Sequence, residues 1–312
     1  MTTLHDNPPS TRPAGARPAG TRPAGARRGR GPFSRWPAAG MTLVEMLVAI
    51  SVLAVMILAV SSILVQTQRF ISAAQENRRS HAMAFTIARI IRRDLRRISK
   101  DGFLCVTSAG GGSMLVFSTA GPTTGINETT KGDGSIVCYG QRSCTNSSDT
   151  SKTVNFLWRP EYVCNCTTGA IPKNISDVTI EGERIGVNFS TLQTCGDPNS
   201  QVKFTLQDIA NKVASTAPSG DLKLPPANAT QLKNLWQVLV TNVDNFQVSW
   251  TDGTKKGPNL NWVTSANLWT YRDQTNWPRA IRITFAIDDP LMPKELRKGT
   301  GYGYEVICTV GQ

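Results

Sequence analysis

The sequence predicts an α+β protein in which one long N-terminal helix, hydrophobic and then amphipathic, packs on an antiparallel β-sheet domain. Two observations predict this class. Residues 41–99 contain no proline or glycine, so a single helix can run through them. From residue 102 onward, short β-rich runs alternate with stretches of Gly, Ser, Thr, Asn and Pro. The 312 residues suffice for one large domain or two small ones.

Residues 1–40 are predicted to be a disordered leader outside the fold. They contain a repeat in which Thr11, Ala16 and Thr21 each precede Arg-Pro-Ala-Gly, and they have too few large apolar residues to bury a core. Seven arginines and one aspartate give the leader +6 of the chain's formal charge of +12. A basic flank stays on the cytoplasmic side of a membrane, so the chain beyond residue 65 is expected on the other side. Such an arm can also bind nucleic acid, but the membrane flank explains the charges more simply.

Residues 41–65 are predicted to be a transmembrane and assembly helix. The twenty residues 46–65 carry no charge, which suits a hydrocarbon core about 30 Å thick. A charge at the centre of such a helix costs about 2.5 to 3.5 kcal/mol, so Glu45 needs a partner. Cleavage after Gly40 would create one, because it frees an ammonium group on Met41, on the same helix or on a neighbouring copy. An uncut anchor whose Glu45 reaches the membrane interface is the alternative.

Residues 66–100 are predicted to continue the helix in amphipathic form, for a total length of about 85 to 90 Å. The apolar residues recur at steps of three and four: Ile71, Ala74, Ala84, Phe85, Ala88, Ile91, Leu95 and Ile98. The other faces carry Arg78, Arg79, Arg89, Arg92, Arg93, Arg96 and Arg97. A basic helix can bind nucleic acid, but without interleaved aromatic residues a solvated face with ion pairs between subunits is the better interpretation. Asp101 and Gly102 are expected to end the helix.

Residues 101–312 are predicted to be an exported antiparallel β domain with long loops, laid against the amphipathic half of the helix. The predicted strands are residues 114–118, 136–139, 154–158, 184–189, 202–206, 235–240, 246–250, 280–287 and 304–310. The alternation is cleanest in residues 280–287, where Ile281, Ile283 and Phe285 share one face. One face of this strand is expected in the core and the other in water.

Seven cysteines in this domain are disulfide candidates: Cys105, Cys138, Cys144, Cys164, Cys166, Cys195 and Cys308. In an oxidising compartment they would form at most three pairs and leave one over. Cys138 and Cys144 flank a short polar loop and are the pair expected most readily to form, and Cys308 could tie the C-terminus to an earlier strand. The spacing of Cys164 and Cys166 also suggests a metal, but a closed zinc site usually takes four Cys or His ligands. No metal site is predicted.

No catalytic residue is predicted either. The histidines are His5, in the leader, and His81, on the long helix, so no Ser-His-Asp or Cys-His arrangement can form within the β domain. Asp288 and Asp289 are neighbours, which places them on opposite faces of a strand. The glycines at 110–112 lack the Lys-Ser/Thr of a phosphate-binding loop. We therefore expect a protein that is not an enzyme and uses no cofactor.

Gly40-Met41-Thr42-Leu43-Val44-Glu45, with the apolar run behind it, resembles the class III signal of type IV pilins and type II secretion pseudopilins. The resemblance implies that a prepilin peptidase cuts between Gly40 and Met41 and methylates the new amino terminus at Met41. It also implies that Thr42, Leu43 and Glu45 belong to the assembly motif, with Glu45 guiding subunits into a helical filament. The implied fold is pilin-like.

Segments near the C-terminus narrow the resemblance. The stretches 243–250, 252–253 and 277–284 are similar to elements of the J-type minor pseudopilin of type II secretion. Residues 89–97, with Asp94-Leu95-Arg96, match the end of the helix both in this group and in the W-type minor pilins. W-type minor pilins of type IV pili share similar elements and are the close second. The J-type resemblance implies a subunit that helps to initiate or cap a periplasmic pseudopilus.

The implied partners are the prepilin peptidase, the I-, K-, H- and G-type pseudopilins, the inner-membrane secretion platform and membrane lipid, and no nucleic acid is expected. The implied location is the inner membrane, crossed once, with the C-terminal domain in the periplasm and the subunit at a pseudopilus or pilus tip after assembly. A type IV pilus minor pilin, for adhesion, motility or DNA uptake, is one alternative function. A membrane-anchored binding module that never polymerises is the other.

Overall fold

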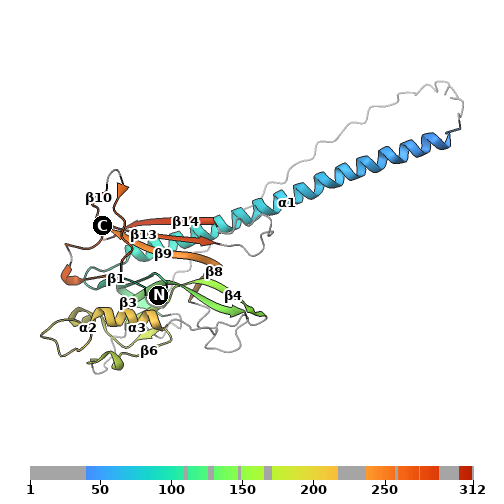
Figure 1. Cartoon of the computed structure of the whole chain (residues 1–312). Coiled ribbons are helices and arrows are strands. Elements are labelled where there is room, and N and C mark those ends of the chain that lie inside the picture. The colour runs from blue at the N-terminus through green and yellow to red at the C-terminus, as the bar shows by residue number, and fades with distance from the viewer. Residues whose placement is uncertain are drawn as a thin grey trace, which may run out of the picture. The chain divides into compact units, whose positions relative to one another are not determined.

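The structure is a computed structural model that describes residues 40–108, 112–125, 130–146, 149–164, 171–216, 237–256, 259–273, 275–287 and 302–310 (Figure 1). The chain divides into two compact units, Met1–Val60 and Ser61–Gln312. Because the described residues begin at residue 40, the predicted leader lies outside them except for Gly40.

One helix, α1 (Leu43–Arg96), has nearly the bounds that the sequence predicts. Its 54 residues include no glycine or proline that would interrupt the backbone hydrogen bonds. After the helix, Ile98 forms an isolated bridge with Thr119, and the chain turns at Gly102. A Cβ atom at Gly102 would collide with the side chain of Ser118, so this close approach of the turn to the sheet requires glycine.

A nine-stranded sheet forms the larger part of the β domain. Its main path runs in the order β12-β1-β2-β3-β5-β7-β6. On β3, residues 135–137 pair with β5 and residues 140–146 pair with β4, which in turn pairs with β8. All of these pairings are antiparallel except that of β5 with β7. The strands are β1 (Phe103–Thr107), β2 (Met114–Thr124), β3 (Lys131–Asn146), β4 (Asp149–Trp158), β5 (Glu161–Cys164), β6 (Ile180–Glu181), β7 (Arg184–Ile185), β8 (Val238–Thr241) and β12 (Asn267–Thr270).

A second, three-stranded antiparallel sheet has the order β14-β13-β9. Its strands are β9 (Val243–Thr251), β13 (Ala280–Ile287) and β14 (Tyr302–Thr309), and β13 has the bounds that its alternating pattern predicts. A short hairpin of β10 (Lys255–Lys256) and β11 (Asn259–Leu260) follows β9. The predicted α+β class, a long helix followed by antiparallel sheets, is confirmed.

Two hydrophobic cores lie on opposite faces of the large sheet. Successive side chains of a strand point to opposite faces, so Leu115 and Phe117 of β2 enter the first core and Met114 and Val116 enter the second. The first core also contains the buried stripe of α1 and the inner face of the three-stranded sheet. The second contains the helices α2 (Phe189–Thr194) and α3 (Leu206–Ser215). Figure 1 shows α2 and α3 on one side of β1 and β3 and the three-stranded sheet on the other.

Two of the predicted strands are wrong, because helices occupy their place. Residues 202–206 are irregular until α3 begins, and the predicted strand 184–189 contains only β7 before α2 starts at Phe189. The cause at α3 is a capping box: the hydroxyl of Thr205 accepts from the N–H of Asp208, whose carboxylate accepts from the N–H of Thr205. Short 3-10 turns occur at Ile175–Asp177 and Tyr271–Asp273.

Candidate assembly helix

The start of α1 is a capping box, a feature that was not predicted from the sequence. The backbone N–H of Thr42 donates to Oε2 of Glu45 over 2.9 Å, and the Thr42 hydroxyl donates to the same oxygen over 3.1 Å. In return, the N–H of Glu45 donates to the Thr42 hydroxyl over 3.3 Å. The signal in the sequence is Thr-x-x-Glu ahead of an apolar run. These reciprocal bonds explain why the helix begins at Leu43.

The junction residues predicted from the sequence lie in two groups. Gly40 and Met41 precede the helix and are exposed, so the peptide bond between them is accessible. Thr42 and Glu45 are held together by the capping box, whereas Leu43 is 80% exposed in the first helical turn and contributes an apolar side chain. Both hydrogen bonds to the Glu45 carboxylate end on Oε2. Within the described residues, Oε1 accepts no hydrogen bond.

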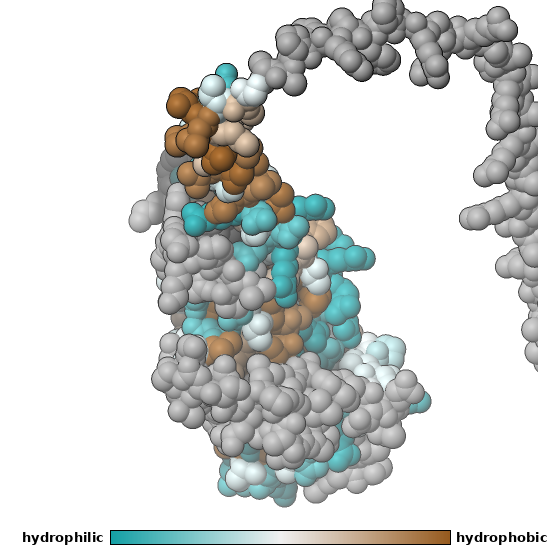
Figure 2. Space-filling model, turned by 90° about the vertical axis from the view of Figure 1, so that its right-hand side faces the viewer, coloured by the Kyte–Doolittle hydropathy of each residue, from teal (hydrophilic) through white to brown (hydrophobic). Residues whose placement is uncertain are grey.

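The helix that follows the junction exposes its apolar side chains on all sides. Every residue from 41 to 72 is exposed, including Leu58 at 71% and Phe70 at 76%. In the part of the chain that the structure describes, α1 is the one helix long and apolar enough to cross a membrane. Figure 2 shows this surface in brown at the top of the view. An apolar surface of this extent needs lipid or other apolar helices around it.

The second half of α1 buries one stripe against the β domain. The stripe consists of Ser80, Ala84, Ile87, Ala88, Ile91, Asp94 and Leu95. It confirms most of the predicted apolar face at residues 84–95, with two differences there, whereas Ile71 and Ala74, also predicted in the stripe, are exposed. Phe85, predicted in the stripe, is 69% exposed, and Ile87, not included in the prediction, is buried. The predicted partner surface of the stripe is formed by both sheets of the β domain.

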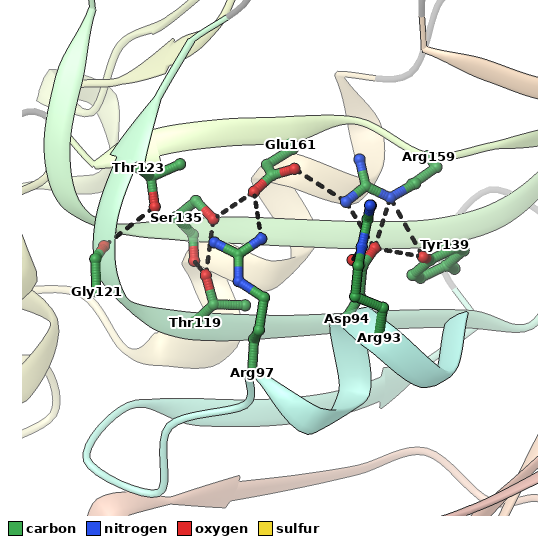
Figure 3. Close-up of polar contacts among 10 residues, drawn as sticks. All are labelled: Arg93, Asp94, Arg97, Thr119, Gly121, Thr123, Ser135, Tyr139, Arg159 and Glu161. Carbon is green, nitrogen blue, oxygen red and sulfur yellow. Dashed lines mark hydrogen bonds and ion pairs between the residues drawn. The ribbon is translucent and has the colours of Figure 1, made fainter. Parts of the chain in front are cut away.

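A buried ion-pair network fastens the end of α1 to the large sheet (Figure 3). The Asp94 carboxylate is fully buried and accepts hydrogen bonds from the Tyr139 hydroxyl and from Nε of Arg159, each over 2.6 Å. Arg159 continues to the Glu161 carboxylate over 2.9 Å. Arg97, just after the helix, reaches the other oxygen of Glu161 over 3.5 Å. The network therefore joins the last turns of α1 to β3 and β5.

The electrostatics of this network favour its charged form. Burial and the negative charge of Asp94 raise the pKa of Tyr139, which keeps the phenol protonated as a donor. Burial alone would raise the pKa of Glu161, but the charge and hydrogen bond of Arg159 outweigh it and lower the pKa. Burial opposes the charge on Arg159, but the neighbouring carboxylates of Asp94 and Glu161 raise its pKa overall. The contacts give the network a structural role.

The described cysteines are all buried. The predicted pairing of Cys138 with Cys144 in a disulfide is wrong. Both residues lie on β3, six residues apart, which separates their Cα atoms by about 20 Å at about 3.3 Å per residue. A disulfide needs Cα atoms within about 7 Å. Cys308 lies in the first core, whereas the second core contains Cys105, Cys138, Cys144, Cys164 and Cys195.

The thiols in these cores are shielded from reaction. Burial raises the pKa of Cys105 to about 11 and that of Cys195 to about 12. Cys105, Cys138, Cys144, Cys195 and Cys308 are free thiols in the structure, while Cys166 lies outside the described residues. Among the residues that the structure describes, no three His, Cys, Asp or Glu side chains are grouped as they would be around a metal ion.

Comparison with known proteins identifies the N-terminal segment. Residues 37–61 match the family described as "Prokaryotic N-terminal methylation motif", which covers Gly40, Met41 and the capping box. No curated protein and no solved structure matches the chain. The chain thus carries the N-terminal motif of type IV pilin-like and type II secretion pseudopilin-like proteins, which are generally structural and not enzymes.

Proposed function

We propose that this protein is a minor pseudopilin that helps to initiate or cap the periplasmic pseudopilus of a type II protein secretion system. In this proposal a prepilin peptidase cuts the chain between Gly40 and Met41 and methylates Met41. The exposed apolar part of α1 then sits in the inner membrane and among the helices of other pseudopilins, with the β domain in the periplasm. The observation that carries the proposal is the matched motif at the head of an unsheltered apolar helix.

The state of Glu45 supports an assembly role. A carboxylate in hydrocarbon needs all of its acceptor positions filled, and the capping box fills only one oxygen. Residues 46–65 contain no charged side chain, and the hydroxyl of Ser51 is already bonded to the carbonyl of Val48. The missing donor must therefore come from outside this segment. The ammonium group that cleavage frees on Met41, in this chain or a neighbouring one, is a donor of the right charge.

The first test is mass spectrometry of the protein purified from cells that contain the secretion machinery. We expect a chain that begins at Met41 and carries one additional methyl group. Recovery of the intact leader, or of an N-terminus elsewhere, would refute the proposal.

A second test separates the two functions of Glu45. Glu45→Gln keeps an oxygen that can accept from Thr42, so the capping box survives, but the charge is lost. Glu45→Ala removes both. If the carboxylate pairs with the new amino terminus, both variants should be cut normally and both should fail to join pseudopilins, as judged by co-purification with the major subunit. If the Gln variant assembles and the Ala variant does not, Glu45 acts as a helix cap only. If the protein is a binding module that never polymerises, both variants should function like the unchanged protein.

A type IV pilus minor pilin is the alternative, because the matched motif is common to both machines. We propose the J-type because residues 243–250, 252–253 and 277–284 resemble that subunit. Neighbouring genes discriminate: secretion ATPase and K-type pseudopilin genes favour the pseudopilus, and retraction ATPase and tip adhesin genes favour the pilus. The proposed partners are the I-, K-, H- and G-type pseudopilins and the secretion platform.

A further inference from the structure

One face of α1 outside the apolar segment combines exposed apolar side chains with a row of arginines. A surface groove on this face, here named the arginine groove, is lined by Phe85, Arg89, Ile90, Arg92, Arg93 and Arg96. Phe85 is 69% exposed, more than any other large apolar side chain described between residues 72 and 310. Its spacing from Arg89, Arg92 and Arg96 places all four on one row of the helix, about 16 Å long.

An apolar groove continues from the arginine groove toward the edge of the large sheet. Its lining residues are Arg79, Ala82, Met83, Thr86, Ile87, Ile90, Leu239 and Val240. Ile90 belongs to both grooves, so they form one surface. Leu239 and Val240 lie on β8, which pairs only with β4 among the described strands and stays half-buried along its length. The joined surface is an apolar strip with arginines at both ends.

The arginines of this surface have little compensation among the residues that the structure describes. Residues 66–100 carry nine basic side chains and two acidic ones, Glu76 and Asp94. Asp94 is buried and already bonded to Tyr139 and Arg159, so its contact with the exposed Arg93 adds little neutralisation at the surface. Arg89 makes no ion pair within the described residues. A partner that covers this face must therefore bring negative charge.

A second copy of this chain does not meet that requirement. The same face of another copy would set arginine rows against each other, and the chain beyond the leader keeps a net formal charge of +6. Nucleic acid supplies negative charge, but proteins that bind single strands stack bases on several aromatic rings, and Phe85 is the only ring in the arginine groove. An apolar strip flanked by cations fits an amphipathic helix with carboxylates beside its apolar stripe.

We infer that the arginine groove and the adjoining apolar strip dock an acidic amphipathic helix of a different protein subunit. The inference deepens the proposed function, on which it rests, because it gives the chemistry of the neighbouring subunit. Phe85 and Ile90 provide the apolar contact, and Arg89, Arg92 and Arg96 pair with carboxylates of the partner. The chain then joins a mixed assembly in preference to one made of its own copies.

The experiment places a photo-crosslinking phenylalanine analogue at position 85 of the full-length chain in cells that contain the machinery. We expect crosslinks to a helical segment of another envelope protein, with Asp and Glu beside an apolar stripe, as identified by mass spectrometry of the crosslinked peptides. Arg89→Glu/Arg96→Glu should lower the crosslink yield about tenfold or more. Reversing the matching acidic pair of the partner to arginine should restore it.

Two controls keep the result interpretable. Lys131→Glu/Lys255→Glu makes the same change in net charge at exposed sites outside α1 and should leave the yield unchanged. In membranes isolated from these cells, with the groove unmodified, raising the salt from about 0.1 M to about 1 M before irradiation should lower the yield several-fold, because the screening length falls from about 10 Å to about 3 Å. Crosslinks mainly to copies of this chain, lipid or nucleic acid, or a yield insensitive to both charge reversal and salt, would overturn the inference. A chain still beginning with its leader would instead refute the proposed function.

Discussion

Replacing Asp94 by alanine is expected to destabilise the β domain more than any substitution of an exposed charge on α1. The carboxylate is fully buried and receives the Tyr139 hydroxyl and the Arg159 guanidinium over 2.6 Å each. Its removal leaves a phenol without an acceptor and Arg159, only 14% exposed, without its closest counter-charge. Loss of one partner of a buried ion pair costs about 3 to 5 kcal/mol.

The lower end of that range applies here, because Arg159 keeps Glu161 at 2.9 Å. We therefore expect a loss of about 3 kcal/mol in the free energy of unfolding. For a domain of this size about 1 kcal/mol shifts the melting temperature by about 2 to 4 °C, so the expected shift is about 6 to 12 °C downward. The matched control is Arg93→Ala, since Arg93 contacts the same carboxylate over 3.3 Å but is 64% exposed. That change should cost about 1 kcal/mol or less.

The assay is thermal unfolding of the full chain in detergent, followed by tryptophan fluorescence, because Trp158, Trp269 and Trp277 are buried in the β domain. A third variant, Asp94→Leu/Arg159→Met, removes both charges. Its loss in free energy of unfolding should be smaller than the sum of the losses for Asp94→Leu alone and Arg159→Met alone. Equal melting temperatures for Asp94→Ala and Arg93→Ala, or strict additivity in the double variant, would refute this account of the network.

Three further results are expected. The fold should lose stability as the pH drops below 4.5, since the pKa of Glu161 is lower in the folded chain than its ordinary 4.5, and Glu161→Gln should flatten melting curves recorded against pH in that range. Iodoacetamide at pH 8 should leave Cys105 and Cys195 unmodified until the protein unfolds, because burial raises their pKa values to about 11 and about 12; rapid labelling of the folded protein would contradict this. Thr205→Ala should lower the free energy of unfolding by about 1 kcal/mol through loss of the α3 cap, and an unchanged urea midpoint would speak against it.

The features that the sequence predicts well depend on local patterns. The helix follows from a long run without glycine or proline, and β13 follows from strict alternation over residues 280–287. The strand β1 was not predicted, because Phe103–Thr107 is buried on both faces and its one polar residue, Thr107, stands at the end, so the sequence shows no period of two. At α3, the alternation of Val202, Phe204 and Leu206 indicates a strand, but the Thr205 cap prevails.

The anchor of α1 could not be predicted from one sequence. Asp94 is separated from Tyr139 by 45 positions and from Arg159 by 65, and no local pattern links them. The same limit applies to the arginine groove. The helical period places Phe85 next to the buried stripe, but only the arrangement of both sheets decides that Ile87 is covered and Phe85 is not. Exposure of Phe85 is therefore a tertiary result, and it is the feature that points to a partner.

Two carboxylates of α1 illustrate how their hydrogen bonds separate stability from assembly. Asp94 has its two closest donors, Tyr139 and Arg159, inside the β domain, so it stabilises the subunit. Glu45 has donors only from Thr42, in its own helical turn, and one oxygen is left for a donor that the described residues do not provide. A change at Asp94 should thus lower the melting temperature of the β domain, whereas Glu45→Gln should leave it unchanged. If Glu45→Gln lowered the melting temperature of the β domain as a change at Asp94 does, Glu45 would act in the stability of the subunit, and its loss would be no evidence of a contact with a neighbouring chain.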